Sequence, residues 1–293
     1  MLTVGTDRAG ALRVGPRWLY PAKAAVTRAR SLSWLALNRR RPAADGLRIL
    51  YYHRVAEDRD ELAVSPRQFR LQMDYLEREG FRAISVAEAP ALIERQSASD
   101  RVVVLSFDDG FLDVAENALP ELEQRGFRAT VFVATGVVEG TARFSWYRNR
   151  QPPVLGWSDI VELDQGGTLE FEAHTVTHPN LLTVEDDVAR FEIEESKRTL
   201  EQKLGRRVDI FCYPAGRFGR REERLVREAG FRFATSCDPG VNTAATNPFA
   251  LRRLLIDRRD RLLDFRAKLL GGHDRELPFQ RLYRARRSGP QAR

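Results

Sequence analysis

Apolar residues recur along this chain in two alternating patterns, which predict strands followed by helices. Short runs rich in β-branched and aromatic residues predict strands at residues 48–52, 81–85, 102–107, 129–134, 169–173, 209–213 and 231–235. The longer stretches between these strands predict helices at residues 66–79, 86–95, 113–125, 184–204 and 220–230. Repeated strand-then-helix units predict parallel strands, so we expect an α/β fold in which seven strands form an incomplete (β/α) barrel.

Glycines mark where several predicted helices end. Gly80, Gly126, Gly205 and Gly230 each follow a predicted helix and precede the next strand. Glycine is favoured just beyond a helix end because it adopts a positive φ without steric cost. These positions therefore predict helix ends.

Two adjacent carboxylates follow the strand predicted at residues 102–107. Asp108, Asp109 and Gly110 come directly after this apolar run, so they fall at the carboxyl end of the strand, where α/β folds bind ligands. Neighbouring carboxylates repel each other unless a cation or a proton separates them. The pair therefore predicts a bound partner.

Two histidines follow the strand predicted at residues 169–173. His174 and His178 are four residues apart, which brings both imidazoles to one side of a single turn. Two neutral imidazoles and one carboxylate suit a divalent metal, and zinc is the ion we expect. Asp109 is the most economical third ligand, which leaves Asp108 free to act as a general base.

Each motif alone also has a simpler interpretation. Asp-Asp-Gly is common in solvated turns, and a single His-x-x-x-His is more often a pair of exposed helix residues. Their joint occurrence after two separate strands favours the metal site.

At these residues the chain resembles the polysaccharide deacetylase family, which is carbohydrate esterase family 4 or the NodB-homology domain. Residues 106–110 read Ser-Phe-Asp-Asp-Gly, close to its first motif, and His174-Thr175-x-x-His178 has the form of its second. The resemblance implies a distorted, incomplete (β/α)7 barrel. It also implies that Asp108 is the catalytic base, and that Asp109, His174 and His178 bind the metal.

The third motif of the family is altered here. Residues 211–216 read Phe-Cys-Tyr-Pro-Ala-Gly, similar to the Tyr-Pro-x-Gly form of the exopolysaccharide and poly-N-acetylglucosamine deacetylase branch. The resemblance implies that the Tyr213 backbone amide helps to hold the oxyanion. No arginine precedes Pro214 in this segment, although the usual motif has one to orient the base. Arg217 is a candidate replacement.

The general acid is expected from the first barrel strand. Residues 49–54 read Ile-Leu-Tyr-Tyr-His-Arg and resemble the permuted arrangement of the same branch, so His53 takes this role. First and last strands are neighbours where a barrel closes, which allows a histidine to move between chain ends. A strand-end histidine hydrogen-bonded inside the barrel mouth is the alternative for His53. His273, in Gly271-Gly272-His273-Asp274, is expected in an exposed loop.

The resemblance implies a metal-dependent hydrolase that removes N-acetyl groups from an amino sugar in a polysaccharide or lipid-linked glycan. A metal, a base, an oxyanion donor and an acid meet the needs of amide hydrolysis. Two alternatives remain open. One is a catalytically silent glycan-binding or membrane scaffold protein with the same barrel, and the other is hydrolysis of a different amide or an acetyl ester. Trp146, Tyr147 and Trp157 are expected either to stack on sugar rings or to pack in the core.

The charge of the chain is concentrated at its ends. Residues 47–270 form the predicted catalytic domain, between a basic amphipathic extension at 1–46 and a basic tail at 271–293. The net charge is +7, yet Met1 to Pro42 alone holds nine Lys or Arg and one acid, and residues 279–293 hold five Arg and no acid. No nucleic-acid-binding motif accompanies this charge, so nucleic acid is not an expected partner. The extension suits an anionic membrane surface, or alternatively packs loosely against the barrel.

The expected location is the cytoplasm, with peripheral attachment at the inner membrane face. No apolar run approaches the roughly 18 residues that span a bilayer, and the start lacks the features of a signal peptide. Cys212 and Cys237 fit this compartment as reduced thiols, although a bridge between them stays open.

Overall fold

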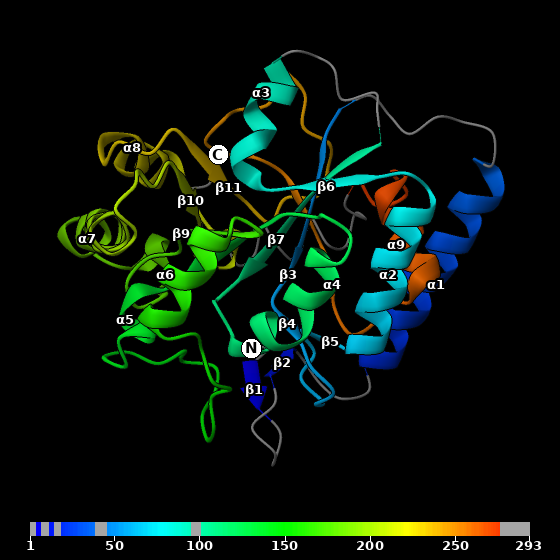
Figure 1. Cartoon of the computed structure of the whole chain (residues 1–293), viewed down its shortest axis with the longest axis horizontal. Helices are drawn as coiled ribbons and strands as arrows, with labels where there is room; N and C mark the ends of the chain where they lie inside the picture. Colours follow the sequence, from blue (N-terminus) through cyan, green and yellow to red (C-terminus); the bar gives the residue numbers. More distant parts are fainter. Residues whose placement is uncertain (1–3, 7–11, 15–18, 39–45, 95–100, 276–293) are drawn as a thin grey trace.

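The computed structural model describes residues 4–6, 12–14, 19–38, 46–94 and 101–275. Parallel strands form a curved central sheet in the order β11-β10-β9-β8-β7-β3-β12, with helices packed outside it (Figure 1). The strands of this path are β3 (Arg48–Tyr52), β7 (Val102–Asp108), β8 (Ala129–Val133), β9 (Leu169–Ala173), β10 (Ile210–Cys212), β11 (Phe233–Thr235) and β12 (Arg253–Leu255). Their residues are largely buried, as expected for a parallel sheet covered by helices.

The sheet closes into a nearly complete barrel with one unsealed seam. The two end strands of the path, β11 and β12, approach each other, and the bridge joining their region is the isolated pair Thr235–Leu251. The predicted incomplete seven-stranded barrel is therefore confirmed. It places the carboxyl ends of β3, β7, β9 and β12 around one mouth.

The seventh barrel strand is not the one predicted from sequence. The segment predicted at 81–85 forms β6 (Arg82–Ile84), which pairs with the first residues of β7 and lies off the main path. Its place in the barrel is taken by β12, which pairs in parallel with β3. β12 was not predicted because it is three residues long and begins at the second of two adjacent arginines, Arg252 and Arg253.

Most predicted helices form close to their expected bounds. They are α2 (Pro66–Arg78), the 3-10 turn η1 (Val86–Glu88) with α3 (Ala89–Glu94), the π-helical turn η2 (Val114–Ala118) with α4 (Leu119–Glu123), α7 (Asp186–Leu204) and α8 (Arg220–Glu228). Gly80, Gly126, Gly205 and Gly230 have φ values of 71°, 62°, 66° and 82°, which confirms the predicted helix ends. Elements that were not predicted are β1 (Val4–Thr6), β2 (Leu12–Val14), β4 (Arg54–Val55), β5 (Ala63–Val64), α1 (Leu19–Leu37), α5 (Thr135–Val138), α6 (Trp157–Gly166), α9 (Leu262–Leu269) and the 3-10 turns η3 (Leu181–Thr183) and η4 (Pro214–Gly216).

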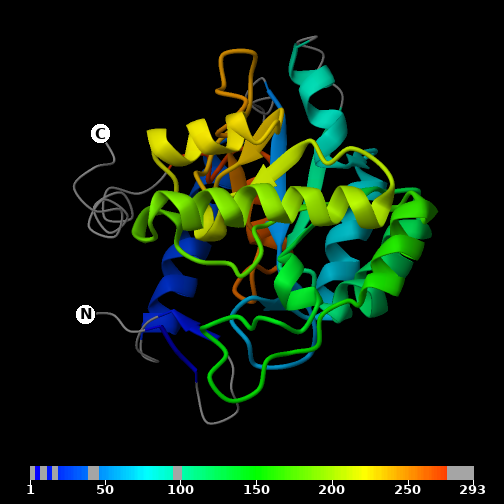
Figure 2. The same ribbon diagram turned by 90° about the vertical axis from the view of Figure 1, so that its left-hand side faces the viewer.

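Two groups of helices flank the barrel. α1, α2 and α9 lie together on one side, and α6, α7 and α8 lie on the other (Figures 1 and 2). α1 belongs to the predicted N-terminal extension, and within the described residues it packs against α9 through an ion pair between Arg28 and Asp264. The remaining residues of the extension and residues 276–293 of the predicted tail lie mostly outside the described part of the chain.

The expectation for His273 is wrong. Its ring is half-buried beside α1, with Nε2 3.0 Å from the Ser31 hydroxyl, because the chain after α9 folds back against α1. Burial lowers the pKa of His273 to about 3.

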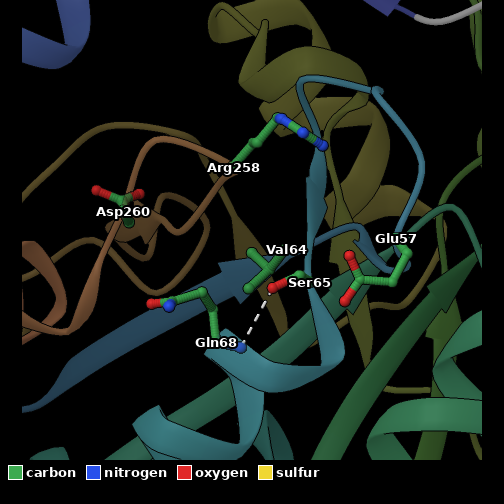
Figure 3. Close-up of a pocket in the computed structure, with 6 residues that line it drawn as sticks. All are labelled: Glu57, Val64, Ser65, Gln68, Arg258 and Asp260. Carbon is green, nitrogen blue, oxygen red and sulfur yellow. Dashed lines mark hydrogen bonds between the residues drawn. The ribbon is translucent and has the colours of Figure 1, made fainter.

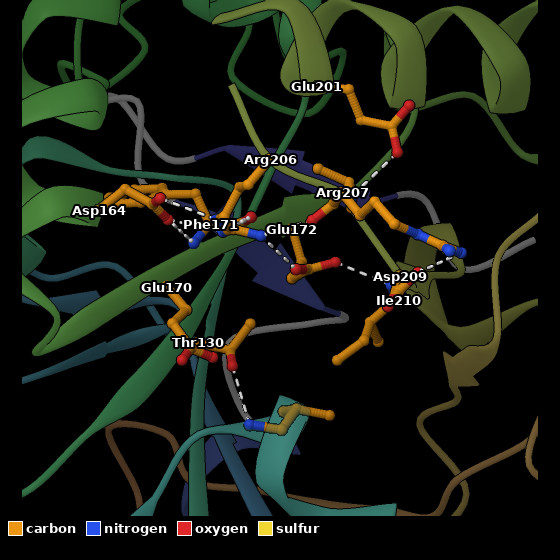
Figure 4. A network of polar contacts seen from close by, with 12 residues as sticks. Thr130, Asp164, Glu170, Phe171, Glu172, Glu201, Arg206, Arg207, Asp209 and Ile210 are labelled. Atoms are coloured by element: carbon orange, nitrogen blue, oxygen red, sulfur yellow. Dashed lines mark hydrogen bonds and ion pairs between the residues drawn. The ribbon is translucent and has the colours of Figure 1, made fainter. Parts of the chain in front are cut away.

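A buried carboxylate joins β9 to β10, which share a single residue pair, Phe211–Ala173. Glu172 accepts hydrogen bonds from the Ile210 backbone N–H (2.7 Å) and from the Arg206 guanidinium (3.1 Å), as Figure 4 shows. Burial raises the pKa of Glu172 to about 7, although Arg206 opposes this rise. The contacts of Glu172 thus compensate for the short ladder between these strands.

Candidate active site

The two adjacent aspartates end β7 at the barrel mouth. Asp108 is the last residue of the strand, and Asp109 and Gly110 turn the chain with φ values of 75° and 67°. A Cβ on Gly110 would lie 2.6 Å from a methyl group of Val133, so this turn requires glycine for space as well as for conformation. Asp109 is not a glycine, and its positive φ is a strained conformation of the kind found at functional sites.

Asp109 and the two histidines converge on one point. The Nε2 atoms of His174 and His178 each lie 3.7 Å from Oδ1 of Asp109. One possible ligand atom from each of the three residues lies within 4.8 Å of the others. The spacing suits a small cation held between a carboxylate and two imidazoles.

A hydrogen-bonded support holds the two histidines in place. His174 Nδ1 lies 2.7 Å from the Cys212 carbonyl, which directs its Nε2 toward Asp109. The turn that carries His178 is held by the buried Glu192 of α7, whose carboxylate accepts the backbone N–H groups of Val176 and Thr177 at 2.8 Å. α7 therefore positions this motif from outside the barrel.

The charges and burial of Asp109, His174 and His178 favour a bound cation. Burial raises the pKa of Asp109 to about 7 and lowers the pKa of His178 well below its usual value. Oδ1 of Asp109 is buried and has no hydrogen-bond partner among the described residues. A divalent cation would stabilise both the carboxylate and the neutral imidazoles, so these residues fit a metal site.

Asp108 is held by an arginine that the sequence analysis did not identify. The guanidinium of Arg253 in β12 forms two hydrogen bonds to Asp108, with Nη1–Oδ1 at 2.7 Å and Nη2–Oδ2 at 2.9 Å. Burial alone would raise the pKa of Asp108, but the charge and hydrogen bonds of Arg253 outweigh it and lower the pKa to about 2. The arginine beside Asp108 is therefore Arg253, and the candidate Arg217 is not the residue found in this position.

Arg253 is fully buried and contacted on several sides. Its guanidinium donates to the Ser236 carbonyl at 2.9 Å, lies 3.0 Å from the Cys212 sulfur and stacks over the Tyr51 ring at 4.3 Å. The sequence signal for it is a pair of adjacent arginines, Arg252 and Arg253, inside the otherwise apolar run Leu251 to Ile256. The contact of Arg253 with Asp108 depends on the pairing of β12 with β3, which the sequence pattern did not predict.

Both cysteines lie near the same guanidinium as reduced thiols. Cys212 is completely buried, and its sulfur lies 3.8 Å from Oδ2 of Asp108. Asp108, His174 and Cys212 also have possible ligand atoms within 4.8 Å of one another. A cation is less favourable there than at Asp109, because Arg253 already neutralises Asp108.

His53 lies at the end of β3, and Asp108 is the charge that most raises its pKa. Burial dominates and lowers the pKa of His53 to about 4, so its ring is neutral at neutral pH. Its Nδ1 is buried without a hydrogen-bond partner among the described residues. The structure thus brings His53 into the electrostatic environment of Asp108.

The Tyr213 amide already has an acceptor. Its N–H donates to the Thr235 carbonyl at 3.2 Å, between β10 and β11. An amide has one proton to donate, so binding an oxyanion would require this bond to be given up. The oxyanion role of Tyr213 stays a prediction that this hydrogen bond does not favour.

Aromatic side chains form one wall beside His178. The Trp146 ring lies 4.6 Å from the His178 ring and stacks on Phe144 at 4.7 Å. Tyr147 is buried and its hydroxyl donates to Asp60, whereas Trp157 packs against the core beneath the Lys203 ammonium. Of the three aromatic candidates, Trp146 is the one that contacts the candidate metal site.

A cavity of about 220 Å³ lies near the start of α2 (Figure 3). Its lining contains no member of the Asp109, His174 and His178 group and comprises Glu57, Val64, Ser65, Gln68, Arg258 and Asp260. One lining residue, Asp260, accepts the backbone N–H of Asp257 at 2.9 Å, two residues beyond the end of β12.

Comparisons with known proteins agree with this architecture. The sequence profile described as "Polysaccharide deacetylase" matches residues 95–234, a segment that holds Asp108, Asp109, His174, His178 and Tyr213. YxkH of Bacillus subtilis, whose name assigns it to the polysaccharide deacetylases, is 24% identical over 211 residues, which cover 72% of this chain and 71% of YxkH.

Two further similarities extend beyond the profile. The poly-beta-1,6-N-acetyl-D-glucosamine N-deacetylase of Staphylococcus aureus is 24% identical over 215 residues, covering 71% of this chain and 72% of that enzyme. The structure of the Streptococcus pyogenes deacetylase PplD in complex with acetate superposes with a TM-score of 0.67 at 24% identity, covering 78% of this chain and 99% of PplD. The second similarity supports the fold.

Proposed function

This chain belongs to the polysaccharide deacetylase family, and from this premise we propose that it removes the N-acetyl group of an amino sugar in a glycan. The observation that carries the proposal is the joint geometry of two adjacent aspartates. Asp109 faces His174 and His178, and Asp108 is held separately by Arg253. This arrangement gives one carboxylate to a metal and leaves the other as a base.

We assign the metal ligands to Asp109, His174 and His178, and zinc is the ion we expect. A divalent metal held there would lower the pKa of a bound water toward about 7 and polarise the acetyl carbonyl. Glu192 and the Cys212 carbonyl fix the two histidines before any ligand arrives. Such preorganisation reduces the free energy spent on ordering the site.

Proton transfer falls to Asp108 and His53. Because the pKa of Asp108 is about 2, its carboxylate is ionised at neutral pH and can accept a proton from the attacking water. His53 is neutral in the resting site, so it must gain a proton before it donates one to the leaving nitrogen. The sum of these steps consumes one water and releases acetate and an amine.

The finer substrate we propose is an N-acetylglucosamine unit of a polysaccharide or a lipid-linked glycan. The similarity to an N-deacetylase of poly-beta-1,6-N-acetyl-D-glucosamine supports an amino sugar. The Trp146 ring beside His178 offers an apolar face to a pyranose, and its indole N–H is buried without an acceptor among the described residues.

Acetate release measured together with bound metal tests this function. The wild-type chain is expected to release acetate from N-acetylglucosamine oligomers after loading with zinc, and a chelator should abolish the release. Asp108→Asn should lower the rate by roughly 100-fold or more and keep the metal, whereas His174→Ala should lose both. Asp187→Asn, exposed in the first turn of α7, is the matched control and should behave as wild type.

The outcomes separate the alternatives. Near-wild-type hydrolysis by Asp108→Asn would show that the base is assigned wrongly. A metal-loaded wild type that binds the oligomers without releasing acetate would instead identify a silent glycan-binding protein. Release of acetate only from O-acetylated sugars would point to an esterase.

A further inference from the structure

The outer face of α1 is apolar along its described length. The exposed positions recur at intervals of three or four residues and therefore share one face of the helix; they are Ala22, Ala25, Val26, Ala29, Leu32, Ser33, Ala36 and Leu37. The larger side chains among them, Val26, Leu32 and Leu37, are 45%, 51% and 82% exposed. None of the eight residues carries a charge, which is unusual for a surface helix.

Two described arginines of α1 turn toward the protein. Arg28 pairs with the buried Asp264 of α9, and Arg30 donates to the Gly272 carbonyl at 2.9 Å. Ser31 is buried on the same side beside His273, and Trp34 packs so closely that a Cβ on Gly272 would lie 3.1 Å from its ring. These contacts fix the rotation of the helix, so the apolar face cannot turn inward without breaking an ion pair with a buried carboxylate.

The sequence around α1 supplies positive charge. Arg39, Arg40 and Arg41 follow one residue after the end of the helix, and residues 1–42 hold nine Lys or Arg with one acid. An apolar helix face within a basic stretch of sequence suits the surface of an anionic bilayer. No described helix is long and apolar enough to cross a bilayer.

We propose that the outer face of α1 docks on an anionic lipid bilayer and lies parallel to its surface. A second copy docked face to face is a poorer occupant, because it would bring two strongly basic segments of sequence together. The proposal concerns how the barrel is held at a surface, and it stands independently of the hydrolytic function.

Cosedimentation of the full-length chain with vesicles tests the proposal. Wild type is expected to pellet with vesicles of phosphatidylcholine and phosphatidylglycerol, weakly with phosphatidylcholine alone, and less as salt rises. The double variant Leu32→Glu with Leu37→Glu should bind the anionic vesicles at least roughly tenfold more weakly, because it removes apolar contact and adds repulsion.

A matched control lies on the other side of the molecule. Val188 and Phe191 of α7 are 43% and 56% exposed, so Val188→Glu with Phe191→Glu makes the same chemical change at a distant apolar pair. This control should bind vesicles as wild type does. Thermal unfolding of both double variants checks that each remains folded.

Three results would overturn the proposal. They are wild type that stays in the supernatant with anionic vesicles, equal pelleting of wild type and the α1 variant, and equal losses in the α1 and α7 variants. Light scattering adds a fourth: a wild-type dimer that the α1 variant dissociates, with no vesicle binding by either, would assign the apolar face to a second copy.

Discussion

Replacing Arg253 with methionine tests the proposed role of Asp108 as the catalytic base. Arg253 is fully buried and donates two hydrogen bonds to Asp108, at 2.7 and 2.9 Å. Methionine has a similar length without the charge, so the variant leaves a buried carboxylate without its ion pair. Breaking a buried pair in this way costs about 3–5 kcal/mol, and we expect the free energy of unfolding to fall by that amount.

The same substitution should change the pKa of Asp108. The pKa of Asp108 is lowered from 3.8 to about 2, a shift that corresponds to about 2 kcal/mol of stability. A lowered carboxyl pKa contributes its full stability above the ordinary value and loses it as pH falls toward 2. Without Arg253, burial dominates and raises the pKa of Asp108 above 3.8, so protonation begins at higher pH.

The assay is the pH profile of kcat/KM for acetate release, measured below the melting temperature of the variant. We expect the acidic limb to move to higher pH in Arg253→Met, with a loss at neutral pH of up to about 10²–10⁴-fold. Arg252→Met, at the exposed neighbouring position, is the control and should leave the profile unchanged. A folded Arg253→Met with the wild-type acidic limb and rate would refute the positioning role of Arg253.

Three further changes have separate readouts. Glu192→Ala removes the acceptor that holds the turn at residues 175–178 and should weaken zinc binding by about 10–100-fold in a chelator competition, with no loss expected if the turn holds itself. Gly216→Ala places a Cβ 2.4–2.7 Å from atoms of Cys237 at a φ of 64° and should cost about 1–3 kcal/mol in chemical denaturation; an unchanged midpoint would contradict this packing. Because the pKa of Glu172 is raised from 4.5 to about 7, wild-type stability should fall as pH rises through that interval, and Glu172→Gln should flatten this dependence; parallel curves would exclude Glu172 as its source.

Local sequence patterns predicted most of the barrel strands and the ends of several helices. Six of the seven predicted strands lie in the barrel path, and the four glycines end their helices as expected, because periodicity and turn chemistry are properties of neighbouring residues. The exchange of β6 for β12 was not predictable in this way. Which strand completes a barrel depends on partners far apart in the chain, and β12 is paired with β3 about 200 residues away.

Part of the candidate site was likewise predictable from local sequence motifs, and part of it was not. Asp108, Asp109, His174 and His178 stand in two compact motifs at strand ends, so the sequence alone determined that they would meet at the barrel mouth. The tertiary structure decided three other features. They are the contact of Arg253 with Asp108, the hydrogen bond from the Tyr213 amide to Thr235, and the inward rotation of the α1 arginines. The local sequence pattern predicts which face of a helix or strand a residue occupies. The partner of a buried charge or amide depends instead on how distant segments of the chain pack together.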